Sequence, residues 1–239
     1  SGGEWVAREP LHRPAPRSVH GLAYDPVSKR VILFGGNDWQ QIFGDTWAWD
    51  GQDWTKLSPK NTPAPRLGPS MATDPVRGRL VLFGGGLGFN GLGGGLSPQS
   101  DTWEWDGKNW IRMQPKTVPD PRAMGLMAYS PVSKAIVLTE GSQAFPWAPP
   151  RKTWEWNGTD WRSFDGIPGG VEPGSLVTDW RTGMPLRFSA FGIPVTWSAS
   201  YWNGKTWKAT TFPYPWQFNQ PRMASDPHSK LLVLVAEGD

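Results

Sequence analysis

The sequence predicts an all-β fold built from a repeated unit of four short strands. A hairpin motif with paired tryptophans recurs about every 50 residues, which is the length of a propeller blade. Short apolar runs that end near glycine recur at matching places. The 29 glycines and 25 prolines recur at fixed positions, where tight turns require them. Together these observations predict a β-propeller of five blades that forms a single domain over residues 1–239.

The hairpin motif is clearest at residues 101–110, which read Asp-Thr-Trp-Glu-Trp-Asp-Gly-Lys-Asn-Trp. Related copies stand at 45–54 and 152–161, and a degenerate copy stands at 200–207. Both tryptophans of Trp-x-Trp point to one face, because side chains alternate along a strand. Asp-Gly or Asn-Gly then predicts a tight primed turn with positive φ angles. We expect the motif's tryptophans to pack each blade on the next.

The first three units each have a Pro-Arg pair, at Arg17, Arg66 and Arg122, and the fourth unit lacks it. Recurrence in register predicts that these arginines are structural and bind carbonyls between blades, rather than an anionic ligand. Segments rich in small residues follow and suit the crowded innermost strand. Apolar runs come next and suit a strand that neighbouring blades bury on both faces. These runs are 30–34, 79–83 and 135–138.

The order Pro-x-Pro-Arg, apolar strand, Gly-Gly and Trp-x-Trp-Asp-Gly-x-x-Trp resembles the kelch repeat of the galactose-oxidase-like propeller superfamily. The resemblance covers essentially the whole chain, is strong in the first three units and weakens after Gly169. It implies a kelch-like β-propeller. Copper-radical chemistry of the galactose oxidase kind does not carry over, because it needs a cysteine cross-linked to tyrosine and this chain has no cysteine.

The last unit contains an Asp-Pro turn and the apolar run 231–235 but no hairpin. The N-terminal Gly-Gly-Glu-Trp aligns with the turn and second arm of the hairpin at 51–54. We therefore expect residues 1–5 to close the last blade as its outermost strand, which removes a free sheet edge. The alternative is a fragment of a longer propeller, or a chain that a partner completes. The blade units are 6–54, 55–110, 111–161, 162–207, and 208–239 with 1–5.

Function is sought in the segments that do not repeat. The connections between the second and third strands share one face with the connections between blades, and binding residues concentrate on such loops. Aromatic side chains gather in these segments, which suits a glycan or a peptide-like ligand. The alternative is that the rings plug the mouth of the propeller. The candidate ligand-binding residues are Trp39, Phe43, Phe89, Phe145, Trp147, Trp197, Tyr214 and Trp216.

The candidate catalytic residues are Glu140, Glu237 and Asp38. The two glutamates occupy the place that Gly35 and Gly84 hold in earlier units. Carboxylates that meet at the channel mouth would suit glycoside chemistry. The alternative, which we favour at this stage, is that they are solvated loop residues.

Composition limits the remaining classes of function. A net charge of +3 from scattered lysines and arginines argues against nucleic-acid binding. The sequence contains no run of 18 apolar residues, so we expect no membrane span. The three histidines lack the spacing of a ligand set, so we expect no metal and no cofactor. We expect a monomer, and we leave the compartment open with a secreted or cell-envelope location favoured.

The sequence therefore predicts a non-catalytic binding or interaction propeller that takes a glycan or peptide-like ligand on its aromatic loop face. One alternative is a carbohydrate-active enzyme with carboxylates at the channel mouth. A second is a structural propeller fragment of a larger secreted protein.

Overall fold

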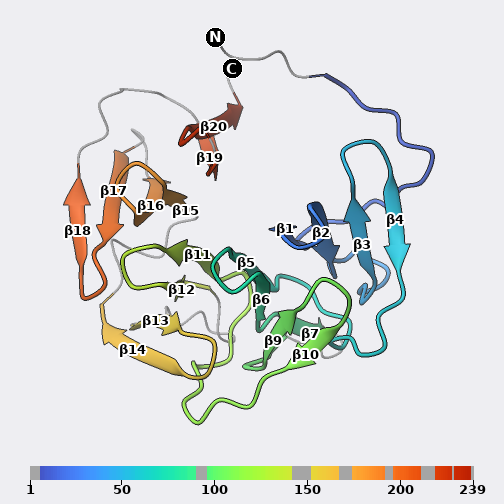
Figure 1. Cartoon of the computed structure of the whole chain (residues 1–239), viewed down its shortest axis with the longest axis horizontal. Coiled ribbons are helices and arrows are strands. Elements are labelled where there is room, and N and C mark those ends of the chain that lie inside the picture. Colours follow the sequence, from blue (N-terminus) through green and yellow to red (C-terminus); the bar gives the residue numbers. More distant parts are fainter. Residues whose placement is uncertain are drawn as a thin grey trace.

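A computed structural model describes residues 6–89, 96–141, 152–166, 174–191, 196–210, 219–227 and 229–237. Within these ranges the protein is all-β and contains no helix, and so no helix that could span a membrane. The strands form a ring of four antiparallel four-stranded sheets and one two-stranded sheet (Figure 1). The propeller-like fold is thus confirmed, with four complete blades among the described residues rather than the five predicted.

The strands of each blade follow the chain. Blade one holds β1 (Gly21–Asp25), β2 (Arg30–Phe34), β3 (Thr46–Trp49) and β4 (Trp54–Leu57). Blade two holds β5 (Ser70–Asp74), β6 (Arg79–Phe83), β9 (Thr102–Trp105) and β10 (Trp110–Arg112). Blade three holds β11 (Leu126–Ser130), β12 (Ala135–Thr139), β13 (Lys152–Trp156) and β14 (Trp161–Asp165). Blade four holds β15 (Gly174–Asp179), β16 (Met184–Phe191), β17 (Thr196–Trp202) and β18 (Trp207–Thr210).

Two further sheets have two strands each. One is the hairpin of β7 (Gly86–Phe89) and β8 (Leu96–Pro98), which lies within the connection between β6 and β9. The other is formed by β19 (Asn219–Ser225) and β20 (Leu232–Glu237) beside blade four. There Met223 and Leu232 pack against the core that contains Val177 and Leu186. Residues 1–5, which are expected to complete this sheet, lie outside the described residues.

Each blade runs from the centre of the ring to its rim. Figure 1 shows β1, β5, β11 and β15 innermost and β4, β10, β14 and β18 outermost. The second strands are buried on both faces, as the apolar runs predict, and β12 is buried along its whole length. Adjacent inner strands are joined by side chains. The hydroxyl of Thr73 donates to the carbonyl of Tyr24 over 2.6 Å, and Thr178 donates to Tyr129 in the same way over 2.7 Å.

Hydrogen bonds from the hairpin tryptophans join neighbouring blades. Trp110, on the rim strand of blade two, donates its indole N–H to Thr46 of blade one over 3.1 Å. The Trp-x-Trp arm makes a second set, in which Trp156 donates to the Glu104 carboxylate of the preceding blade over 2.7 Å. The motif therefore belongs to the scaffold. The same bonds recur from Trp161 to Thr102, from Trp207 to Thr153 and from Trp202 to Glu155.

The hairpin turn differs from the primed two-residue turn that the sequence predicts. Trp49 pairs with Trp54, so four residues form the turn. Only Gly51 has a positive φ, of 102°, whereas Asp50 does not. Oδ1 of Asp50 instead accepts the main-chain N–H groups two and three residues further on, both over 2.9 Å. Asp106, Asn157 and Asn203 cap the other hairpins in the same manner.

Replacing Gly51 with alanine is expected to lower the free energy of unfolding by about 1–2 kcal/mol, which is the cost of a left-handed conformation for a residue with a Cβ. A Cβ at Gly51 would meet no other atom within 4 Å, so the loss would come from the backbone alone. Urea unfolding measures it, with Gln52→Ala in the same turn as the control. Equal stability of the two variants would contradict this account.

Candidate binding surface

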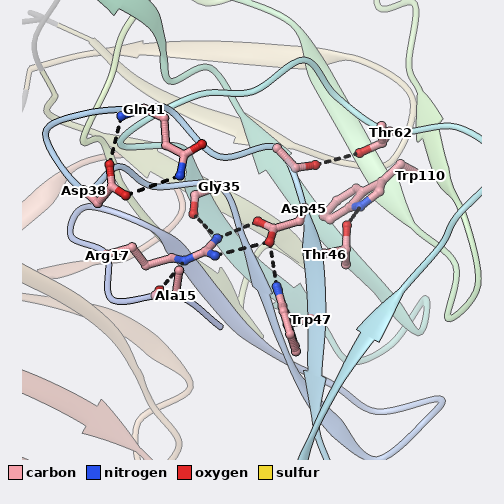
Figure 2. A network of polar contacts seen from close by, with 11 residues as sticks. Ala15, Arg17, Gly35, Asp38, Gln41, Asp45, Thr46, Trp47, Thr62 and Trp110 are labelled. Atoms are coloured by element: carbon pink, nitrogen blue, oxygen red, sulfur yellow. Dashed lines mark hydrogen bonds and ion pairs between the residues drawn. The ribbon is translucent and has the colours of Figure 1, made fainter. Parts of the chain in front are cut away.

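The face that carries the β2–β3 connection is built on a buried ion pair (Figure 2). The guanidinium of Arg17 donates to both carboxylate oxygens of Asp45, over 2.6 and 3.2 Å, and to the carbonyls of Ala15 and Gly35. The indole N–H of Trp47 donates to the same carboxylate over 2.7 Å. Burial alone would raise the pKa of Asp45, but the bonds from Arg17 and Trp47 outweigh it and the pKa lies below its ordinary value. Asp45 is therefore held as an anion.

Blade two repeats this arrangement. Arg66 donates to both oxygens of Asp101, over 2.6 and 3.0 Å, and to the carbonyl of Gly84 over 2.8 Å. Trp103 donates to the same carboxylate over 2.7 Å. The arginines thus bind carbonyls, but within their own blade and not between blades as the sequence analysis predicted. The aspartate partners were missed, although an Asp before Thr-Trp recurs in two of the three clear hairpin motifs.

Trp39 stands in the β2–β3 connection and points into solvent, with 83% of its surface exposed. Its φ is 71°, which is uncommon for an aromatic residue. Asp38 holds this turn, because its Oδ1 accepts the main-chain N–H groups of Gln40 and Gln41 over 3.0 and 2.8 Å. The turn therefore presents the indole outward at a defined position, and Trp39 does not plug the mouth of the propeller.

Phe43 lies deeper in the same connection. The guanidinium carbon of Arg17 sits 3.8 Å from the centre of its ring, so one ring face is covered. Its main-chain carbonyl accepts the N–H of Arg66 over 3.1 Å and links blade one to the start of blade two. Phe43 therefore supports the surface, and its other ring face and edge are what remain for contact with a ligand.

The other predicted aromatic residues are described only in part. The main chains of Phe89 and Trp197 belong to β7 and β17, and their side chains lie outside the described residues. Trp197 is paired with Ala190 of β16, so it belongs to β17 and not to a connection between the second and third strands, where the sequence analysis places it. The remaining candidates, which are Phe145, Trp147, Tyr214 and Trp216, lie outside the described residues altogether.

The predicted carboxylates serve the scaffold where they are described. Glu140 is not the solvated loop residue we expected, because it is buried and paired with Arg187 of blade four. Asp38 caps its own turn, and the N–H of Gln41 in particular holds the pKa of that carboxyl below its ordinary value. Glu237 ends β20 opposite Asn219, with its side chain outside the described part. Within the described residues, no group of three or more histidine, aspartate or glutamate side chains could hold a metal ion.

The comparisons with known proteins add no assignment. No model of a known protein family matches the sequence, and no curated protein matches it. The function of the loop face is therefore argued from its own residues.

Proposed function

We propose that this chain is a non-catalytic binding propeller that binds a glycan on its loop face. The observation that carries the proposal is Trp39, an exposed indole on a turn that Asp38 fixes by hydrogen bonds. A sugar ring stacks on such a flat apolar surface, and binding loses little entropy where the aromatic residue is already held in place. Gln40 and Gln41 follow Trp39 in the chain and are exposed, and their amides can both donate to and accept from sugar hydroxyls. These amides favour a glycan over a proline-rich peptide.

We further infer that the propeller is of kelch type and closes with a fifth blade formed by β19, β20 and the N-terminal residues. The side of β1 that would face this blade supports the inference. Leu22 and Tyr24 are 51% and 47% exposed there, whereas their counterparts Met127 and Tyr129 on β11 are 8% and 4% exposed. A completed fifth blade would cover this side of blade one, as blade two covers that side of blade three.

Replacing Trp39 with alanine is expected to weaken glycan binding at least about tenfold, because stacking on an aromatic anchor is lost. The melting temperature should stay within about 1 °C, since an exposed side chain contributes little to the core. A glycan array followed by calorimetric titration of the best ligand measures the effect. Leu11→Ala, at a residue exposed elsewhere, is the control and should bind as the wild type does.

Two results would contradict the proposal. One is undiminished glycan affinity in Trp39→Ala. The other is an array on which no glycan binds while proline-rich peptides do, which would assign the surface to peptides.

A further inference from the structure

Blade three keeps the arginine and tryptophan of blades one and two but lacks their aspartate. Arg122 corresponds to Arg17 and Arg66, and Trp154 corresponds to Trp47 and Trp103. The position that Asp45 and Asp101 hold, directly before the Thr-Trp of the hairpin, is Lys152. Lys152 is exposed at the start of β13. Lysine has therefore replaced the aspartate that binds the arginine and the tryptophan in blades one and two.

Two donors of blade three lack an acceptor, and they are the two that an aspartate at position 152 would bind. Arg122 keeps its bonds to the carbonyls of Asp120 and Glu140, over 3.1 and 3.3 Å. Its Nη2, however, has no hydrogen-bond partner within the described structure, and neither does Nε1 of Trp154. In blade two the corresponding two atoms both donate to Oδ2 of Asp101. An acceptor is thus missing at one definite place.

No neighbouring carboxylate takes this place. The carboxylate of Asp120 is exposed and stays 3.9 Å from Nη2 of Arg122, beyond hydrogen-bonding distance. The carboxylate of Glu140 is paired with Arg187, and its main-chain carbonyl accepts a hydrogen bond from Nη1 of Arg122. The connection at 142–151, which joins β12 to β13, contains no aspartate or glutamate in its sequence. The charges of these side chains are positive on balance, with Arg122, Arg187 and Lys152 against Glu140 and Asp120.

Leaving this guanidinium without an anion at hydrogen-bonding distance is unfavourable. The side chain of Arg122 is fully buried, and burial lowers its pKa to about 10. A buried donor without a partner forfeits the hydrogen bond that water would give it, and a buried cation loses still more. Blade four shows how the arrangement is dispensed with as a whole. Counted along the sequence from Asp179 and Trp202, the positions of arginine, aspartate and tryptophan hold Val171, Ser198 and Ser200, so neither the guanidinium nor the indole is present.

We propose that Arg122 and Trp154 form a binding site for a carboxylate group supplied by a ligand, which occupies the place of the missing aspartate. A planar carboxylate fits because the equivalent sites in blades one and two bind one, with the guanidinium on both oxygens and the indole on one of them. The site needs no contact with Trp39. A free small carboxylate and the uronic acid of a glycan share this chemistry, and either could supply the group.

Sodium acetate tests the site in the whole protein, with sodium chloride at equal ionic strength as the reference. About 100 mM acetate should raise the melting temperature of the wild type by about 3 °C relative to chloride, as expected for a ligand present well above its dissociation constant. The NMR resonance of the Trp154 indole N–H should shift as acetate is added. This resonance is identified as the one that disappears in Trp154→Phe. No acetate effect on either measurement would overturn the proposal.

Lys152→Asp is the decisive variant, because it restores the aspartate without removing either donor. It should melt about 4–8 °C above the wild type in chloride and lose the acetate response. Lys152→Ser is the matched control, which removes the lysine without adding a carboxylate and should keep the response. An acetate response that survives in Lys152→Asp, or that is lost in Lys152→Ser, would overturn the assignment to Arg122 and Trp154.

Glucuronate and glucose identify the source of the carboxylate. Glucuronate that binds at least about tenfold more tightly than acetate, with no binding of glucose, would assign the site to an acidic sugar. Equal binding of glucuronate and acetate would assign it to a free small carboxylate. Trp39→Ala should leave the acetate response unchanged, so a failure of the glycan proposal and a failure of this one are separate results.

Discussion

Replacing Asp101 with asparagine is expected to lower the free energy of unfolding by about 3–5 kcal/mol. Arg66 is buried, and its guanidinium bonds both oxygens of Asp101 over 2.6 and 3.0 Å. Asparagine keeps the shape of the side chain but carries no charge, so the buried cation loses its counterion. Trp103 also loses an ionised acceptor for its indole N–H. Urea unfolding followed by circular dichroism measures the change.

Asp106→Asn, in the same blade, is the matched control. Oδ1 of Asp106 accepts the main-chain N–H groups of Lys108 and Asn109, and an asparagine keeps that oxygen. The chain itself uses asparagine at this place in the next two blades, at Asn157 and Asn203. The control should therefore change stability by less than about 0.5 kcal/mol. Equal losses in the two variants would mean that the ion pair is not the source of the effect.

The same ion pair makes stability depend on acid. Burial alone would raise the pKa of Asp101, but the bonds and charge of Arg66 outweigh it, so the pKa lies below its ordinary value. A carboxyl group of this kind contributes stability that is complete above its unfolded pKa of about 4 and is lost as the pH falls through the lowered pKa. The difference in stability between the wild type and Asp101→Asn should therefore shrink below about pH 4.

The strands of this fold were predictable because their causes are local. Alternation along Trp-x-Trp and the apolar runs depend only on neighbouring residues, and both predict strands that the structure contains. The turn was predicted only in part. A glycine with positive φ follows from Asp-Gly, but the two main-chain hydrogen bonds of Asp50 select a four-residue turn over the primed one. Side-chain capping of this kind competes with turn propensity and is hard to weigh from the sequence.

The contacts that determine the site lie between residues far apart in the chain. Glu140 was noticed because it replaces a glycine of the repeat, yet its partner Arg187 replaces a leucine of the repeat in the next blade. No local pattern indicates that these two positions face each other. In the sequence Lys152 is one residue of a hairpin motif, and its importance follows from the structure, in which Arg122 Nη2 and Trp154 Nε1 lack an acceptor. Repeats aid here, because blades one and two show what blade three is missing.

Replacing Trp110 with alanine is expected to lower the free energy of unfolding by about 3–5 kcal/mol. Trp110 lies on the rim strand of blade two, yet none of its surface is exposed, because it packs across the boundary with blade one. Its ring packs edge-on against Phe34, with 5.4 Å between the ring centroids, and its N–H donates to the hydroxyl of Thr46 of blade one. Alanine would leave a cavity at this boundary and a hydroxyl without its donor. Urea unfolding again provides the measurement.

Two variants distinguish the packing of Trp110 at this boundary from a general effect of substitution in β10. Ile111→Ala alters the next residue of β10, whose side chain is partly exposed, and should cost less than about 1 kcal/mol. Trp110→Phe keeps most of the ring but loses the bond to Thr46, and a loss of about 1 kcal/mol is expected. If Trp110→Ala were no worse than Ile111→Ala, the blades would not depend on this tryptophan. The large loss predicted here requires instead that a rim residue of one blade stabilises the blade before it.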